Sequence, residues 1–499
     1  MSNDSTIQLL VFLGLNALIG FITWLHCRKA DRSTNDTREY FLASGTLNWV
    51  FIAGSITLTN INTDTLVGMN GAQMLGIALW ELSGVVGLIL LAKIFVPLYY
   101  KYNCTTVTEL LERRYNNKHI RATVATIFLL GDVLIFLPVM LYTSSLVIKT
   151  MFGLEIPLIA LAGGTAVVGA VYAIGGGLRA VAISDTYAGV VVLGMALLLT
   201  VLSLNAVNWD LSSIPHERLT LIGGPDAPVP WTTLLTGMIF TQLYYWSTNQ
   251  TITQRALAAP SVREAKKGVY AAAIVRLLII PPMVAIPGVV AFKLYGKLGD
   301  GTYGHLVGNL LPHWLVGAFA AAMFGAVMTS YNATLNSAAS LYVCDIHQRY
   351  VNADVRIRPL SVWLQIGFAL LSIALVPLYT GAESIIQLIQ QLIGLFSMPI
   401  LSAFIIGLLF RNVDARAVIA TVVFGALFYA AFSFGWPVWH KAYPALIPAP
   451  WHFLHSMFLT VWACIGFALT LNRFGFGRRA EFELGTRESW RSAFAVLRS

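Results

Sequence analysis

Apolar runs of about 20 residues, separated by short polar segments, dominate the hydropathy pattern of this chain. A bilayer core about 30 Å thick needs roughly 20 apolar residues per helix, so each run predicts a membrane-spanning helix. The short alternating segments of a membrane β-barrel are not seen. The pattern predicts an all-α polytopic membrane protein with about 13 transmembrane helices. The runs lie near 7–26, 48–72, 74–97, 121–148, 155–174, 181–204, 229–253, 267–291, 308–342, 358–378, 384–409, 417–435 and 453–471.

The composition agrees with this pattern. Of the 499 residues, 57% are hydrophobic and 11% are charged, whereas soluble proteins carry about 25% charged residues. This balance excludes a water-soluble globule, a disordered chain and a secreted disulfide scaffold. The four cysteines form no CxxC pair, so no redox or zinc site is expected. The spans hold no nucleophile arrangement or cluster of acids and histidines, and we expect no enzymatic activity.

The net charge of +9 could suggest a nucleic-acid partner, but the positions of the charges argue otherwise. Most of the 32 lysines and arginines fall in the odd-numbered connections and in the tail. Because basic residues favour cytoplasmic loops, the N-terminus is predicted outside and the C-terminus in the cytoplasm. The predicted location is the plasma membrane, which in a bacterium is the inner membrane. No nucleic acid and no obligatory protein partner are expected.

Two predicted spans carry more polar groups than a lipid-facing helix tolerates. The second contains TLTNINTDTLVG at 57–68, and the seventh contains FTQLYYWSTNQTITQR at 240–255. Asn, Asp and Thr side chains compete for backbone hydrogen bonds, so both spans are predicted to be interrupted helices. Interrupted helices at corresponding positions in the two halves of a chain indicate an inverted-repeat transporter with a binding site at mid-membrane. The alternative is that these polar groups only join helices together.

The ninth span places Ala326, Thr329 and Ser330 on one helix face. Hydroxyls and carbonyls together would form an oxygen cage for a monovalent cation, although a small-residue face can equally serve close packing. Charged residues within spans are costly and usually functional. Here they are Asp132, Asp185 and Arg276, with Glu81 and Glu383 expected less deep. An internal ion pair is the alternative role for these residues.

Several segments resemble the sodium:solute symporter family, most closely its sodium/sugar cotransporter branch. The matching segments are FLASGTLNW (41–49), GGLRAVAISD ending at Asp185, YYWSTNQTITQRALAAPSVREAKKG (244–268), LNSAASLYVCDIHQRY (335–350) and IQQLIGLFSMPILSAFIIGLLFR (389–411). The resemblance implies a leucine-transporter-like fold with a 5+5 inverted-repeat core. The implied divisions are an N-terminal helix and loop (1–40), the first repeat (41–210), the second repeat (211–412), two further helices (413–472) and a basic tail (473–499).

The same resemblance implies a sodium site. Carried over to this chain, its ligands are the carbonyls of Leu58, Ile61 and Ala326 and the hydroxyls of Thr329 and Ser330. Members that use a second sodium ion have hydroxyls where this chain has Asn332 and Ala333, although Asp185 is retained. We therefore expect one sodium ion per transport cycle.

The resemblance also implies a set of solute-binding residues. They are Thr65, Gln242, Tyr245, Arg276 and Gln390, with Asn62, Asp132 and Asp185 as possible accessory residues. Gln242 replaces an Asn of sugar-binding members and Arg276 replaces a Lys. An Arg fork suits a carboxylate, but Asp132 stands where sialic acid carriers have Arg. Asp132 would repel a carboxylate, and it could accept sugar hydroxyls or pair with Arg276.

The expected function is sodium-coupled import of a small polar solute by alternating access. A neutral sugar or polyol is expected first. The alternatives are an anionic sugar of the sialic acid or uronate type, proline, or another organic acid. A membrane receptor that senses a solute is less expected, because such receptors usually append a soluble domain and only 27 residues follow residue 472.

Overall fold

The computed structural model describes residues 3–27, 42, 45–61, 64–152, 155–224, 227–380 and 385–482, and it is almost entirely helical. One short antiparallel pair, β1 (Phe410–Arg411) with β2 (Glu481–Phe482), joins the end of the α20 span to the segment after α23. The α-helices are α1 (Asn3–Cys27), α3 (Trp49–Asn60), α4 (Met69–Gly71), α5 (Ala78–Leu90), α6 (Val96–Lys101), α7 (Val107–Tyr115), α8 (Lys118–Gly131), α9 (Leu137–Phe152), α10 (Leu158–Ala206), α11 (His216–Leu219), α12 (Gly237–Leu243), α13 (Gln250–Leu257), α14 (Val262–Leu278), α15 (Ile280–Tyr295), α16 (Thr302–Leu310), α17 (His313–Ser340), α18 (Gln348–Tyr350), α19 (Ile357–Leu375), α20 (Ile385–Leu409), α21 (Ala415–Ala430), α22 (Trp436–Ala442) and α23 (Phe453–Thr470).

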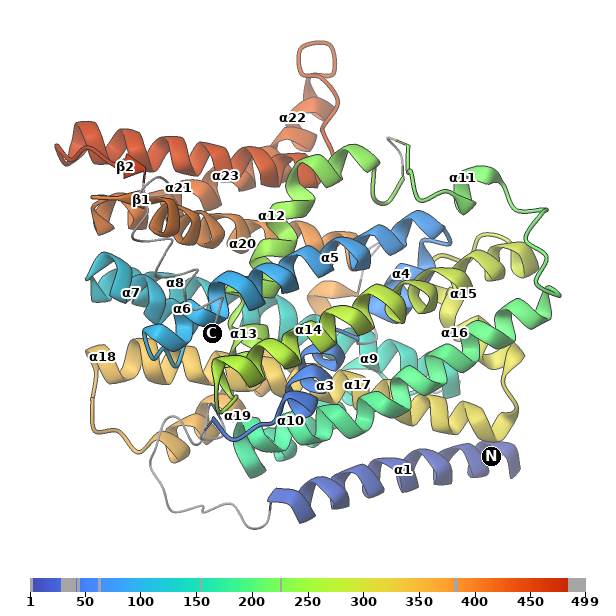
Figure 1. The fold of residues 1–499 in the computed structure, drawn as a ribbon. Coiled ribbons are helices and arrows are strands. Elements are labelled where there is room, and N and C mark those ends of the chain that lie inside the picture. Colours follow the sequence, from blue (N-terminus) through green and yellow to red (C-terminus); the bar gives the residue numbers. More distant parts are fainter. Residues whose placement is uncertain are drawn as a thin grey trace.

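The long helices run side by side across the molecule (Figure 1). In the same view α1 forms one edge, next to α10 and α17, and α21 with α23 forms the opposite edge. Nine helices among the described residues are long and apolar enough to cross a membrane, and Trp49–Asn60 and Leu158–Gly169 are shorter apolar helices. The prediction of an all-α membrane protein is confirmed. The number of spans and their orientation remain predictions.

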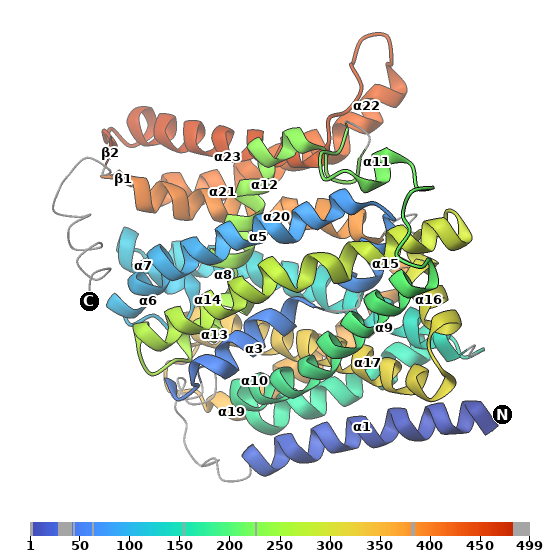
Figure 2. The same cartoon turned by 45° about the vertical axis from the view of Figure 1, so that its right-hand side comes forward.

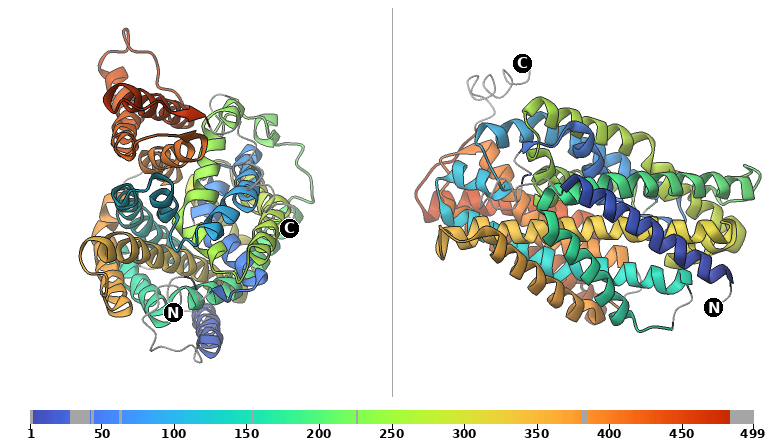
Figure 3. Two further views of the ribbon diagram at one scale, coloured as in Figure 1. Left: turned by 60° about the vertical axis from the view of Figure 1, so that its left-hand side comes forward. Right: turned by 90° about the horizontal axis from the view of Figure 1, so that it is seen from below.

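Two predicted spans, 155–174 and 181–204, lie within the single 49-residue helix α10. A straight helix of that length would extend about 74 Å at 1.5 Å per residue, more than twice the bilayer core. Figures 2 and 3 show that α10 instead folds back into two arms. The segment between the two predicted spans is itself helical, because glycines weaken a helix but, unlike proline, do not remove its hydrogen bonds.

Both predicted helix interruptions are present. The first follows α3, where Ile61 leaves the helical region with φ −91° and ψ 85°, and a π-helical turn (Asp64–Gly68) leads into α4. The second follows α12 and another π-helical turn (Tyr244–Thr248), where Asn249 is extended at φ −77° and ψ 128°. The Asn249 side chain accepts a hydrogen bond from Thr251 N at 2.8 Å and caps α13. Polar residues at these positions therefore stop one helix and start the next.

A third interruption was not predicted. The predicted span 267–291 divides into α14 and α15 at Ile279, two residues before Pro281. Proline has no backbone N–H and cannot continue the hydrogen bonds of the preceding turn. The division places Arg276 in the last turn of α14, deep in the protein.

Candidate functional site

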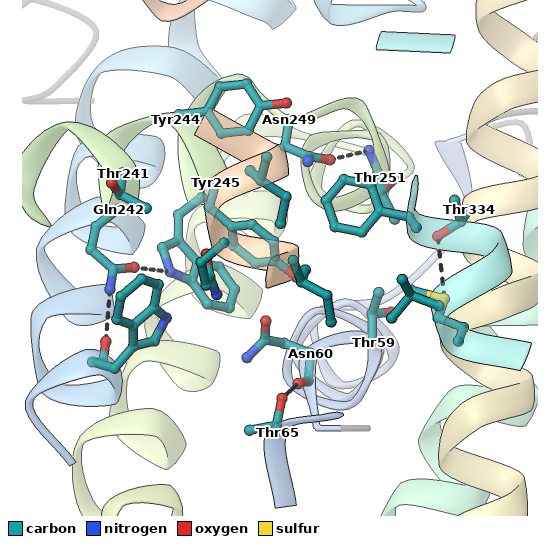
Figure 4. Close-up of a pocket in the computed structure, with 18 of the residues that line it drawn as sticks. Thr59, Asn60, Thr65, Thr241, Gln242, Tyr244, Tyr245, Asn249, Thr251 and Thr334 are labelled. Atoms are coloured by element: carbon teal, nitrogen blue, oxygen red, sulfur yellow. Dashed lines mark hydrogen bonds between the residues drawn. The ribbon is translucent and has the colours of Figure 1, made fainter. Parts of the chain in front are cut away.

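A cavity lies at the centre of the molecule, between the two interrupted helices (Figure 4). About 100 Å³ of it is open to the centres of water molecules, which is room for several waters. All five predicted solute-binding residues and Asp132 line it. The wall consists of Thr59, Asn60, Thr65, Met69, Trp80, Glu81, Asp132, Phe136, Val139, Met140, Thr241, Gln242, Tyr244, Tyr245, Trp246, Asn249, Thr251, Arg276, Thr334, Ile389, Gln390 and Ile393.

Gln242 is held by the protein through both ends of its amide. Its Nε2 donates to the carbonyl of Trp80 at 2.7 Å, and its Oε1 accepts from Trp246 Nε1 at 3.0 Å (Figure 4). The same Nε2 also donates to Ser83 Oγ at 2.9 Å. These bonds fix one wall of the cavity. The close approach is possible because α5 has glycine here: a β-carbon at Gly84 would lie 2.9 Å from Trp246 Nε1.

Arg276 forms a buried ion pair with Glu81 of α5. The Arg276 side chain is 3% exposed and that of Glu81 is 0% exposed, and the guanidinium stacks 4.1 Å from the Trp246 ring centre. One atom of each partner, Glu81 Oε1 and Arg276 Nη2, has no hydrogen-bond partner. Glu81, expected to lie less deep in the membrane, is fully buried within the protein. The suggested pairing of Arg276 with Asp132 is wrong, because α5 packs directly on α14 and supplies the counter-charge.

Asp132 also lines the cavity, at the start of a π-helical turn after α8. Its side chain is 4% exposed, and Ser337 Oγ of α17 donates to Oδ2 at 3.2 Å. Among the residues that the structure describes, no Lys, Arg or His nitrogen lies within 4.0 Å of this carboxylate.

The predicted sodium ligands lie where α17 crosses the end of α3. Ser330 Oγ donates to the carbonyl of Thr59 at 2.7 Å, and Leu58, Ile61 and Ala326 are buried beside it. The last carbonyls of a helix lack partners within the helix, so oxygen atoms gather at this crossing. The side chains of Thr329 and Asp185, and all of Asn62, lie outside the described part of the structure.

A second buried network at the predicted cytoplasmic end was not foreseen. Arg121 of α8 contacts Asp345 at 2.6 Å and Glu112 at 2.6 Å. Thr106 and Thr108, at the start of α7, donate to the two oxygens of Asp345. Arg121 is only 3% exposed, although its position in the sequence suggested a loop charge. Asp345, which follows directly after an apolar span, was the feature of the sequence that could have indicated this network.

The comparisons with known proteins agree with this architecture. The model of the sodium:solute symporter family matches residues 40–425. The chain is 33% identical over 494 residues to the uncharacterized symporter YidK of Escherichia coli (strain K12), covering 94% of this chain and 83% of that protein. It is 29% identical over 461 residues to the sodium/glucose cotransporter of Vibrio parahaemolyticus, covering 84% and 83%.

Among solved structures, a substrate-bound outward-open Na⁺-coupled sialic acid symporter superposes with a TM-score of 0.81. The superposition covers 95% of this chain and 99% of that one at 16% sequence identity. The likeness shows a common fold and, at this identity, nothing about the solute.

Proposed function

The chain belongs to the sodium:solute symporter family and is an integral membrane transporter, and from this premise we propose that it imports a small neutral polyhydroxylated solute, a sugar or polyol, together with one sodium ion per cycle. Relatives that carry glucose and myo-inositol with sodium support this solute class. The solute would bind in the central cavity against Thr65, Gln242, Tyr245, Arg276 and Gln390.

The ion pair in the cavity wall is the observation that carries the choice of solute. A free arginine would favour a carboxylate, but Glu81 already neutralises Arg276. Asp132 adds a second carboxylate, so the ionised wall would be negative rather than positive before any cation binds there. The wall therefore offers an anionic solute no free positive charge, whereas hydroxyl groups could hydrogen-bond to the Arg276 and Glu81 side chains that line the cavity.

The proposed sodium ligands are the carbonyls of Leu58, Ile61 and Ala326 and the hydroxyls of Thr329 and Ser330. The contact of Ser330 with the end of α3 supports this set. Neutral oxygens without a carboxylate suit a hard monovalent cation. Because the ion would touch both α3 and α17, its binding would hold these two helices together, and its release would let them separate.

Sodium binding from outside would stabilise the outward-open state, and the solute would then bind beside the ion. Rocking of one repeat against the other would expose both to the cytoplasm. One charge crossing 100 mV is worth about 2.3 kcal/mol, which supports roughly a fiftyfold solute gradient at about 1.4 kcal/mol per tenfold.

The test is uptake by the purified chain in proteoliposomes, with an inward sodium gradient or with choline in its place. Glucose and myo-inositol represent neutral solutes, and sialic acid, glucuronate and proline represent the alternatives. We expect sodium-driven uptake of a neutral solute with one charge per solute. Uptake confined to the acids, or two charges per solute, would contradict the proposal.

The same assay tests the ion site. Thr329→Ala combined with Ser330→Ala should abolish sodium-driven uptake. Thr143→Ala combined with Ser144→Ala is the matched control, because these buried hydroxyls bond only to carbonyls of their own helix α9. Sodium stimulation that survives in the Thr329/Ser330 variant would refute the proposed ligands.

A further inference from the structure

A row of hydroxyl groups follows one face of α17 beyond the proposed sodium ligands. Ser330, Thr334, Ser337 and Ser340 stand at positions i, i+4, i+7 and i+10, which share a helix face. All four are at most 3% exposed. The row extends about 15 Å at 1.5 Å per residue, from the crossing with α3 toward the predicted cytoplasmic end.

The hydrogen bonds of this row leave oxygen lone pairs free. Thr334 Oγ1 donates to the carbonyl of Ser330 at 3.0 Å, and Ser340 Oγ donates to that of Ser337 at 2.8 Å. A hydroxyl that donates its proton to a helix carbonyl still has lone pairs for a cation. The row is therefore a set of potential oxygen ligands.

Asp132 meets this row at its middle, through Ser337. It also lines the central cavity together with Thr334, so water and ions in the cavity can reach it. A buried carboxylate is costly unless a positive charge offsets it. Asp345 has Arg121 as its counter-ion, whereas the described residues provide none for Asp132.

We propose that Asp132 and Ser337, with the hydroxyl oxygen of Thr334, form a second binding site for a monovalent cation, sodium. A single carboxylate with neutral hydroxyls and cavity water fits a monovalent rather than a divalent ion. The site lies about 10 Å along α17 from Ser330. This inference rests on the proposed sodium site at Ser330, because both sites use hydroxyl groups of the same row on α17.

The distance between the two sites sets how they influence each other. Two unit charges about 10 Å apart, at an effective dielectric constant near 20, weaken each other's binding roughly fifteenfold. The second ion should therefore bind more weakly than the first. For the same reason Asp132→Asn would weaken sodium at Ser330 through space, so the number of ions bound is a better measure than affinity.

The experiment is equilibrium binding of ²²Na⁺ to the detergent-purified full chain, up to saturation, with choline as the balancing cation. We expect two ions per wild-type chain and one per Asp132→Asn chain. Ser337→Ala, which changes no charge, should keep two ions with the weaker one bound at least fivefold more weakly. The control is Asp210→Asn, which removes an exposed carboxylate outside the cavity. This variant should still bind two sodium ions. A monodisperse elution profile and an unchanged melting temperature in choline show that each variant is folded.

Two ions bound to Asp132→Asn, or a single ion bound to the wild type, would overturn this inference. Full binding by the Thr329→Ala and Ser330→Ala variant would instead refute the proposed sodium ligands and leave the Asp132 site standing. No binding at all by the wild type would overturn both. The number of ions moved per cycle is a separate quantity, measured by the charge-to-solute ratio.

Discussion

The molecule contains two buried arginine–carboxylate clusters, and they differ in how completely their side-chain atoms are hydrogen-bonded. At the predicted cytoplasmic end, Arg121 and Asp345 have every side-chain nitrogen and oxygen satisfied, because two threonines and Glu112 complete the network. At the cavity, Arg276 and Glu81 are equally buried, but each keeps one atom without a partner.

The difference separates a structural role from a binding role. A fully satisfied buried network rigidifies the fold, whereas a partly satisfied one carries a cost that a ligand can remove. The Arg276 and Glu81 side chains line the central cavity, so a solute bound there would lie against the pair. The Arg121 network lies outside this cavity, and no buried side-chain atom of Arg121 or Asp345 lacks a hydrogen-bond partner.

Breaking the satisfied network should have the largest effect on folding. Asp345→Ala leaves Arg121 buried without its main counter-ion, and removing one partner of a buried pair typically costs about 3–5 kcal/mol. We expect a much lower yield of monodisperse protein and a clearly lower melting temperature in detergent. Asp354→Ala, in an exposed loop, should behave like the wild type. A stable Asp345→Ala variant would show that the network is not structural.

Changing the Arg276–Glu81 pair should lower solute affinity as well as stability, because Glu81→Gln also leaves the buried Arg276 guanidinium without its counter-ion. Glu81→Gln keeps the shape of the side chain but removes its charge, and a hydrogen bond to a charged group is worth about 1.5–3 kcal/mol. The half-saturating solute concentration in sodium-driven uptake should rise roughly 10- to 150-fold. Glu155→Gln, at an exposed carboxylate, is the control. A much lower melting temperature of Glu81→Gln with unchanged solute affinity would show that this pair is structural and does not bind the solute.

Removing the hydrogen bonds of Gln242, beside the Arg276–Glu81 pair, should have a smaller effect. Gln242→Leu retains volume but removes the bonds to Trp80, Ser83 and Trp246. The Trp246 ring under Arg276 would lose its anchor, and we expect solute affinity to fall about fivefold, equivalent to about 1 kcal/mol. The matched control is Gln365→Leu, a fully buried glutamine with no partner on either amide atom. That change should be neutral or stabilising, and uptake with melting curves measures both.

A charge cluster near the surface should show the smallest effect. Asp414 caps α21 by accepting a hydrogen bond from the Arg416 backbone N–H. The side-chain hydrogen bonds from the Arg416 guanidinium hold the pKa of the Asp414 carboxyl below its usual 3.8. Asp414→Ala should cost about 1 kcal/mol as a lost cap. Because the folded-state pKa is lowered, the stabilisation is present above the usual pKa and is lost as the pH falls through the lowered value. The melting-temperature difference between wild type and variant should therefore shrink in acid, and a constant difference would contradict this account.

Local chemistry made much of the fold readable from the sequence. The apolar runs predict helices because lipid forces each span to satisfy its own backbone bonds, and the breaks near Asn60 and Asn249 follow from the side chains at those positions. The resemblance to the sodium:solute symporter family is confirmed. The division of the chain into five segments, the ion ligands and the solute-binding residues stay predictions, although all five predicted solute-binding residues line the cavity.

Only the tertiary structure decided how the buried charges pair. Arg276 and Glu81 are 195 positions apart in the chain, and Arg121 and Asp345 are 224 apart. The sequence by itself determined that these charges lie in or near the membrane, because hydropathy is a property of each segment alone. Which carboxylate meets which arginine, and that Asp132 meets none among the described residues, depends on where helices distant in sequence cross.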